Sequence, residues 1–141
     1  MIRLFDRWSL DAQLVLGIIA LLLGGAVGVV GPRILNSAKL TKVDGDFLAF
    51  KSSFMTYRNL CGIYPTTQQG FEALVKKPST PPVPSRWQKT LDSVPLDPWG
   101  NEYQYRYPGS KDPNEPEISS FGPDGKENTD DDLSSQDNIQ G

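Results

Sequence analysis

The residues best suited to chemistry lie in one acidic segment, Phe121 to Leu133, which reads Phe-Gly-Pro-Asp-Gly-Lys-Glu-Asn-Thr-Asp-Asp-Asp-Leu. A Ca²⁺ ion takes about six to eight oxygen ligands, drawn from carboxylates, carbonyls and waters. A loop that brings Asp124 back onto Asp131 and Asp132 would supply several of them, and a cation would relieve the repulsion between the adjacent acids. The spacing is not that of an EF-hand, so a solvated acidic turn is the alternative.

Other kinds of catalytic chemistry find little support in the residue types. The chain has no His, which excludes nucleophilic triads that rely on His and argues against a zinc site. Nothing in the sequence places two carboxylates in a cleft for glycoside chemistry. The lone Cys61 cannot form an intramolecular disulfide and is expected to pack as a small apolar residue. We therefore expect a protein that is not an enzyme, with no catalytic residue.

Charge is distributed unevenly along the 141 residues. Residues 1–42 carry five basic and two acidic side chains, whereas residues 43–141 carry nine basic and fifteen acidic ones. An acidic segment without a basic, aromatic stripe repels phosphate, so nucleic acid is not an expected partner. Cations suit this part of the chain better.

The elements that must position the acidic loop begin with a segment, Ala12 to Pro32, that contains no charged residue. As a helix it would span about 30 Å, close to the hydrocarbon thickness of a bilayer. We expect one transmembrane helix over 12–32, after a short cytoplasmic leader at 1–11 whose Arg3 and Arg7 keep it inside. Asp11, at the cytoplasmic edge, is either an ordinary interfacial residue or a partner for a basic group on a neighbouring subunit.

A second apolar pattern predicts that this helix continues beyond the bilayer, over residues 33–62. Its apolar positions recur every three or four residues, which places them on one helix face that needs a cover. A kink is expected at Gly31-Pro32. The positions are Leu40, Val43, Phe47, Phe50, Phe54 and Tyr57.

Residues 63–141 are expected to form a globular head. Thr66 and Gln69 form a capping-box pattern that predicts a short helix ending near Pro78, and the Pro-rich residues 78–84 predict an extended loop. Alternating polar and aromatic residues predict a strand over 102–107, and a second strand is expected over 117–121 after a hairpin connection. The predicted fold is α+β, with a small antiparallel sheet packed on the long helix.

Three blocks of the head resemble a known family. Tyr64 to Val75 contains Tyr-Pro-Thr-Thr, Val94 to Tyr103 contains Asp-Pro-Trp-Gly, and Ser120 to Gly125 contains Gly-Pro-Asp-Gly before the Asp130 to Asp132 run. In order and spacing the blocks are similar to the major pseudopilin of bacterial type II secretion, the G subunit. The resemblance implies a type IV pilin-like fold in which the long helix forms the core of a filament.

The resemblance also implies a function and partners. Family members are structural subunits that polymerise at the inner membrane, with the head in the periplasm, into a pseudopilus that helps to export folded proteins across the outer membrane. The expected partners are copies of the same chain, other pseudopilins, inner-membrane assembly proteins and, before assembly, the lipid bilayer. Two alternatives are a non-polymerising, membrane-anchored periplasmic binding module and a pilin of a related type IV pilus.

The resemblance extends to the acidic loop and, less closely, to the leader. Family members bind calcium at the positions that match the side chains of Asp124, Asp131 and Asp132 and the carbonyls of Phe121 and Thr129. In the leader, Asp11 stands for the family's acid, which would neutralise a basic terminus during docking. No Gly precedes Trp8, so the family's cleavage and methylation do not follow for this chain.

Overall fold

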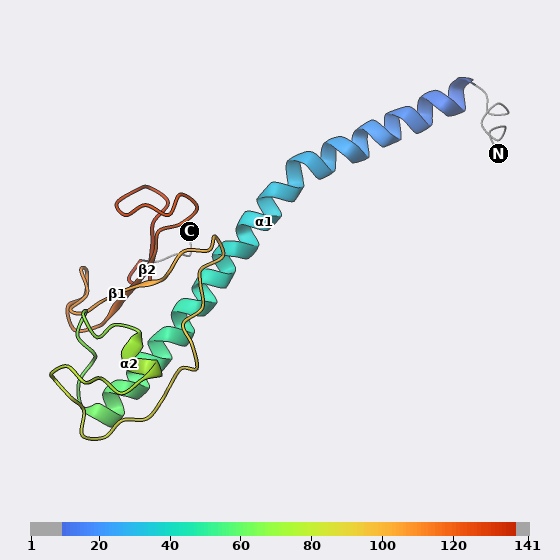
Figure 1. Cartoon of the computed structure of the whole chain (residues 1–141). Coiled ribbons are helices and arrows are strands. Elements are labelled where there is room, and N and C mark those ends of the chain that lie inside the picture. Colours follow the sequence, from blue (N-terminus) through green and yellow to red (C-terminus); the bar gives the residue numbers. More distant parts are fainter. Residues whose placement is uncertain (1–9, 138–141) are drawn as a thin grey trace. The chain divides into compact units, whose positions relative to one another are not determined.

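The structure, a computed structural model, describes the backbone of residues 10–137 and the side chains of residues 12–20 and 35–137. Five elements follow one another along the chain (Figure 1). Residues up to Lys39 form one compact unit and those from Leu40 onward form a second. The elements are α1 (Leu10–Cys61), α2 (Glu72–Val75), β1 (Gln104–Arg106), β2 (Glu117–Ser120) and β3 (Leu133–Ser134).

The first unit contains the N-terminal part of α1, where the predicted membrane segment lies. Leu14 and Ile18 are more than half exposed. Among the residues with described side chains, no helix is long and apolar enough to cross a membrane. Residues 21–34, which include the rest of the predicted span and the expected kink, lie outside the described side chains. The domain boundaries predicted at 11, 32 and 62 therefore stay predictions.

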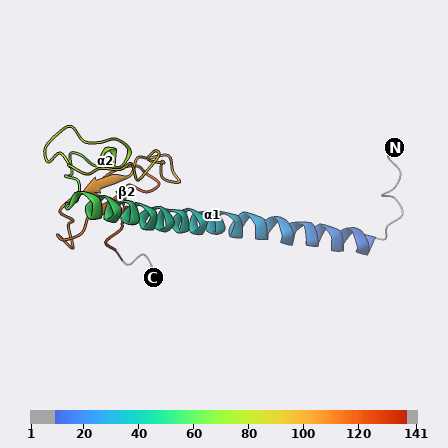
Figure 2. The same cartoon turned by 90° about the horizontal axis from the view of Figure 1, so that it is seen from below.

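The second unit is built on the C-terminal part of α1, and both views show α2 and β2 beside this part of the helix (Figures 1 and 2). The predicted apolar face forms the core, with Phe50, Phe54 and Tyr57 at most 2 % exposed. Leu40 was expected on this buried face and is 40 % exposed, so that prediction was wrong. The three-four periodicity identifies the face of a helix but not where its cover stops.

Aromatic rings make up most of the contact between α1 and the rest of the head. Phe54 stacks on Tyr105 of β1, with ring centroids 4.3 Å apart. Phe50 meets Tyr103 and Phe71 edge to face at 5.0 and 4.8 Å. Such pairs add to the free energy gained by burying the rings themselves. The core is therefore an aromatic cluster shared by α1, by Phe71 at the N-terminal end of α2, and by Tyr103 and Tyr105 at β1.

The helix α2 is shorter than the sequence predicted. The capping box forms as expected, because Thr66 N–H donates to Gln69 Oε1 at 3.1 Å and Gln69 N–H donates to Thr66 Oγ1 at 3.2 Å. Gly70 then adopts a left-handed φ of +48°, which no α-helix continues. The residues after Thr66 thus form turns, and only Glu72–Val75 is α-helical.

The sheet contains three antiparallel strands in the order β1-β2-β3. Tyr105 lies opposite Ile118, and Ser120 lies opposite Leu133. Both predicted strands and the hairpin between them are present, although β1 is shorter than predicted. The sequence missed β3, which begins at Leu133, the last residue of the acidic segment, and pairs the chain with β2 again.

Cys61 lies at the end of α1 and packs against the edge of the core, as predicted. Its thiol donates to the carbonyl of Arg86 at 2.9 Å. Burial, the largest effect, raises the pKa of this thiol. The side chain therefore behaves as a small packed group.

The buried tyrosines make the head sensitive to alkali. Burial raises the pKa of Tyr57 from about 10 to about 12, and it also raises the pKa of Tyr103 and Tyr105. Each neutral phenol stabilises the fold fully below pH 10, and this stabilisation is lost as the pH rises toward the folded-state pKa. Thermal melts followed by circular dichroism should show the midpoint falling steadily between pH 10 and about 12. Tyr57→Phe should show a weaker dependence, and a midpoint constant up to pH 12 would contradict the prediction.

Candidate metal centre

The acidic loop connects β2 to β3, and two glycines allow it to fold tightly. Gly122 and Gly125 have left-handed φ values of +60° and +64°. A Cβ on Gly122 would fall on the carbonyl of Asp131 and 2.7 Å from its Oδ2. The two ends of the loop therefore approach each other closely, which brings Asp131 back toward the residues that follow β2.

Three carboxylates converge on one hydroxyl at the centre of this loop. Thr129 Oγ1 lies 2.7 Å from Asp131 Oδ1, 3.4 Å from Asp124 Oδ1 and 3.5 Å from Asp132 Oδ1. A hydroxyl has a single proton and can donate to only one acceptor at a time. The carbonyl of Lys126, 3.1 Å from Thr129 Oγ1, is a fourth acceptor nearby, so this one hydroxyl cannot satisfy all the oxygens around it.

Backbone N–H groups orient each of the three acids. Asp131 Oδ2 accepts from the N–H of Asp124 at 3.1 Å, and Asp132 Oδ2 accepts from the N–H of Asn128 at 2.7 Å. Asp124 Oδ1 accepts from the N–H of Lys126 at 2.9 Å. The hydroxyl of Thr129, followed by the N–H of Asp124, lowers the pKa of Asp131. The loop therefore favours the charged form of this carboxylate.

Carboxylate and carbonyl oxygens, the donor types present in this loop, are those that a hard cation such as Ca²⁺ takes. The side chains of Asp124, Asp131 and Asp132, predicted from the sequence, are brought together, and the predicted carbonyls of Phe121 and Thr129 belong to the same loop. Each carbonyl accepts one backbone N–H, from Gly125 at 3.2 Å and Asp132 at 3.3 Å respectively, and has a second lone pair. In the described part of the chain, no Lys or Arg forms an ion pair with the three acids.

The arrangement is not a ready-made metal cage. Among the described residues, no three acidic, Cys or His side chains are grouped closely enough to form one. The Thr129 hydroxyl lies between the three carboxylates, a role that no pattern in the sequence indicates. A cation would have to take the place of that hydroxyl as the common partner of the acids.

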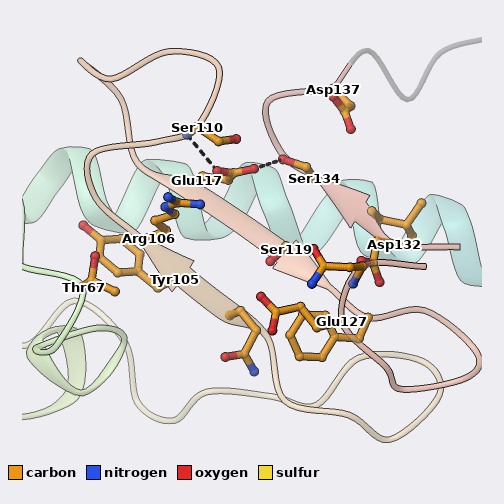
Figure 3. Close-up of a pocket in the computed structure, with 14 residues that line it drawn as sticks. Thr67, Tyr105, Arg106, Ser110, Glu117, Ser119, Glu127, Asp132, Ser134 and Asp137 are labelled. Carbon is orange, nitrogen blue, oxygen red and sulfur yellow. Dashed lines mark hydrogen bonds between the residues drawn. The ribbon is translucent and has the colours of Figure 1, made fainter. Parts of the chain in front are cut away.

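Beside the loop, a groove of about 780 Å³ crosses the open face of the sheet. Glu117 lies in this groove between Ser110 and Ser134 (Figure 3), accepting from the Ser110 N–H at 2.9 Å and the Ser134 hydroxyl at 2.8 Å. Burial opposes its ionisation, but these hydrogen bonds and the charge of Arg106 outweigh burial and lower the pKa of Glu117. Its carboxylate thus joins the hairpin to β3.

Asp11, the residue predicted to act in assembly, lies within α1 but outside the described side chains. Only its place on the helix is therefore defined. Its role in assembly stays a prediction.

A long helix packed on a small antiparallel sheet is the architecture of type IV pilin-like proteins, so the predicted fold class is confirmed. The family described as type II secretion system, protein G, matches residues 33–138. The chain belongs to this family. The predicted role as a structural subunit of the type II secretion pseudopilus is thereby confirmed.

Individual relatives agree with this membership. A type II secretion system core protein G of Pseudomonas aeruginosa is 42 % identical over 115 residues, which cover 78 % of this chain and 80 % of the relative. The corresponding protein of Dickeya chrysanthemi is 37 % identical over 121 residues, covering 82 % and 78 %. The crystal structure of the major pseudopilin of enterohaemorrhagic Escherichia coli matches with a TM-score of 0.68 at 38 % identity, over 76 % of this chain and 92 % of that one.

Proposed function

We propose that this chain polymerises at the bacterial inner membrane into a pseudopilus whose growth helps to export folded proteins across the outer membrane. The observation that carries this proposal is the family match over residues 33–138, which includes the C-terminal part of α1 and the described head. In this arrangement α1 is anchored in the membrane by a single pass, with the head in the periplasm. Its partners are copies of itself, other pseudopilins and inner-membrane assembly proteins.

Exposed apolar side chains on α1 support the proposal that other molecules cover this helix. Leu14 is 65 % exposed in the first unit, and Leu48 is 69 % exposed in the second. Burying such side chains is favourable by about 1.5–3 kcal/mol each. Lipid would cover the first unit before assembly, and neighbouring subunits would cover α1 in the filament.

The same proposal includes Ca²⁺ as a structural ligand of the head. The side chains of Asp124, Asp131 and Asp132 and the carbonyls of Phe121 and Thr129 would hold it. The ion would be the positively charged partner that no Lys or Arg of the described residues provides for the three carboxylates. Its support is the convergence of those carboxylates on the single hydroxyl of Thr129, at 2.7 to 3.5 Å.

Charge reversal at Asp11 tests whether this residue is needed when the chain docks into the filament. In a strain that lacks this chain but retains its sibling components, Asp11→Lys should reduce filament formation and secretion at least tenfold, because a Lys cannot neutralise a basic terminus during docking. The head should remain folded, as judged by resistance of the extracted protein to proteolysis. Filaments would be counted by electron microscopy and a secreted enzyme would be assayed in the medium.

Asp6→Lys is the matched control, since it reverses the other acid of the leader and should assemble normally. Normal filaments from Asp11→Lys would refute the docking role of that residue. If the wild-type chain itself forms no filament beside its sibling components, the proposal that it polymerises at the inner membrane is wrong.

A further inference from the structure

A tight turn between the α2 segment and β1 lies directly against the acidic loop. Asp97 is 5 % exposed, and its Oδ1 accepts the N–H groups of Trp99 at 3.0 Å and Asn101 at 2.8 Å. The N–H of Asp97 donates in turn to the carbonyl of Asn101 at 2.9 Å. The N–H of Gly100 also donates to the carbonyl of Asp97 at 3.0 Å. The turn is therefore closed on itself by four hydrogen bonds, which makes it a rigid support.

The turn holds both backbone polar groups of Gly122, where the acidic loop begins. The carbonyl of Gly122 accepts from Asn101 Nδ2 at 2.8 Å. The N–H of Gly122 donates to Ser120 Oγ at 3.2 Å, and that fully buried hydroxyl donates to Asp97 Oδ2 at 2.6 Å. Gly122 is thus fixed by the turn directly on one side and through Ser120 on the other.

Two glycines of the loop approach neighbouring side chains closely, and these contacts link the turn to the carboxylates. A Cβ on Gly125 would lie 2.9 Å from Asn101 Oδ1, so the loop passes tightly over the Asn101 side chain. A Cβ on Gly122 would lie 2.7 Å from Asp131 Oδ2. The position of Gly122 therefore sets where Asp131 can lie, and Asp131 is one of the three acids around Thr129.

We infer that the turn from Asp97 to Asn101 positions the acidic loop for a divalent cation, with Asp97, Asn101 and Ser120 as positioning residues that do not touch the ion. This inference rests on the calcium site proposed above. It assigns a role to the Asp-Pro-Trp-Gly segment that packing alone does not require, because the Asn101 amide is directed at the loop backbone rather than at the core. Without that amide the chain still has all three carboxylates, but we expect the loop that carries them to be less rigidly held.

The experiment compares Asn101→Ala and Ser120→Ala with controls matched in residue type, in the full chain purified in detergent. Asn114→Ala removes an amide that donates to Asp112 Oδ1 at 3.2 Å in a different turn, and Ser135→Ala removes a buried hydroxyl that accepts the Ile118 N–H at 2.9 Å. Calcium chloride is titrated into each protein by isothermal calorimetry. We expect both positioning variants to raise the dissociation constant at least tenfold, and both controls to stay within about threefold of the wild type.

Amide hydrogen exchange of the metal-free proteins gives the second readout. Exchange at residues 122–132 should be at least tenfold faster in Asn101→Ala than in the wild type or in Asn114→Ala, while the amides of α1 in the core stay protected. A merely structural loss of stability would instead speed exchange throughout the head.

The two readouts separate the possible failures. If the wild type binds calcium and the positioning variants bind it equally well, the inference is wrong and the calcium site stands. If the wild type gives no calcium heat, the calcium site is wrong. Faster loop exchange in Asn101→Ala would then still support a positioning turn, and unchanged exchange would overturn that as well.

Discussion

Removing calcium is expected to lower the thermal midpoint of the head by roughly 10 °C relative to saturating calcium. A ligand that binds only the folded state at a hundredfold excess over its dissociation constant stabilises by about 2.7 kcal/mol. Asp131→Ala should abolish this increment, because it removes one of the three carboxylates proposed to hold the ion, the one nearest to the Thr129 hydroxyl at 2.7 Å. The measurement is a thermal melt with excess calcium and with a chelator.

Asp130→Ala is the matched control for that variant. Asp130 is exposed and precedes Asp131 directly, but its side chain is not one of those that surround Thr129. Its removal should leave the calcium increment within about 2 °C of the wild type. An increment that survives in Asp131→Ala, or that disappears equally in both variants, would contradict a specific site and favour a general charge effect of the acidic segment.

The sequence predicted the parts of the fold that repeat. A helix face repeats every three or four residues, so the apolar spacing alone identifies Val43, Phe47 and Phe54 as core residues, and all three are buried. Leu40 belongs to the same repeat but lies beyond the covering layer. Periodicity records which side of a helix is apolar, whereas the extent of burial depends on residues distant in the chain.

The sequence failed where one residue decides the outcome or where a segment is too short to show a pattern. Gly70 is a single position whose left-handed φ reduces a predicted helix to one turn. The β3 strand has two residues, so no alternation can appear in it, and only its pairing with β2 defines it. The first depends on the backbone conformation of one residue and the second on pairing with a distant strand, and residue propensities along the sequence report neither.

The candidate site divides in the same way. The acids of the loop can be found from the sequence because hard oxygen donors crowd into one segment. The link from Asp97 to Ser120 joins residues that are 23 positions apart, and no local pattern indicates it. The Asp-Pro-Trp-Gly motif predicts a turn, but only the structure shows that this turn faces the acidic loop.

Phe54→Ala is expected to destabilise the head by about 3–5 kcal/mol, the range for removing a buried aromatic side chain. Phe54 is fully buried, stacks on Tyr105 at 4.3 Å and lies 5.3 Å from Phe71, so its loss leaves a cavity where α1, the α2 segment and β1 meet. Small domains have only about 5–15 kcal/mol of stability in total. The variant should therefore unfold at much lower denaturant concentrations, as followed by circular dichroism of the full chain in detergent.

Met55→Ala separates this loss from an effect on the helix itself. Met55 is the next residue along α1 and is 52 % exposed, so removing its side chain opens no cavity and should cost less than about 1 kcal/mol. If Phe54→Ala and Met55→Ala were equally stable, the aromatic cluster would not be what holds the head to α1. If only Phe54→Ala is unstable, the aromatic cluster is what holds the head on α1. The same helix is the proposed core of the pseudopilus, so this cluster would also fix the position of each head along the filament.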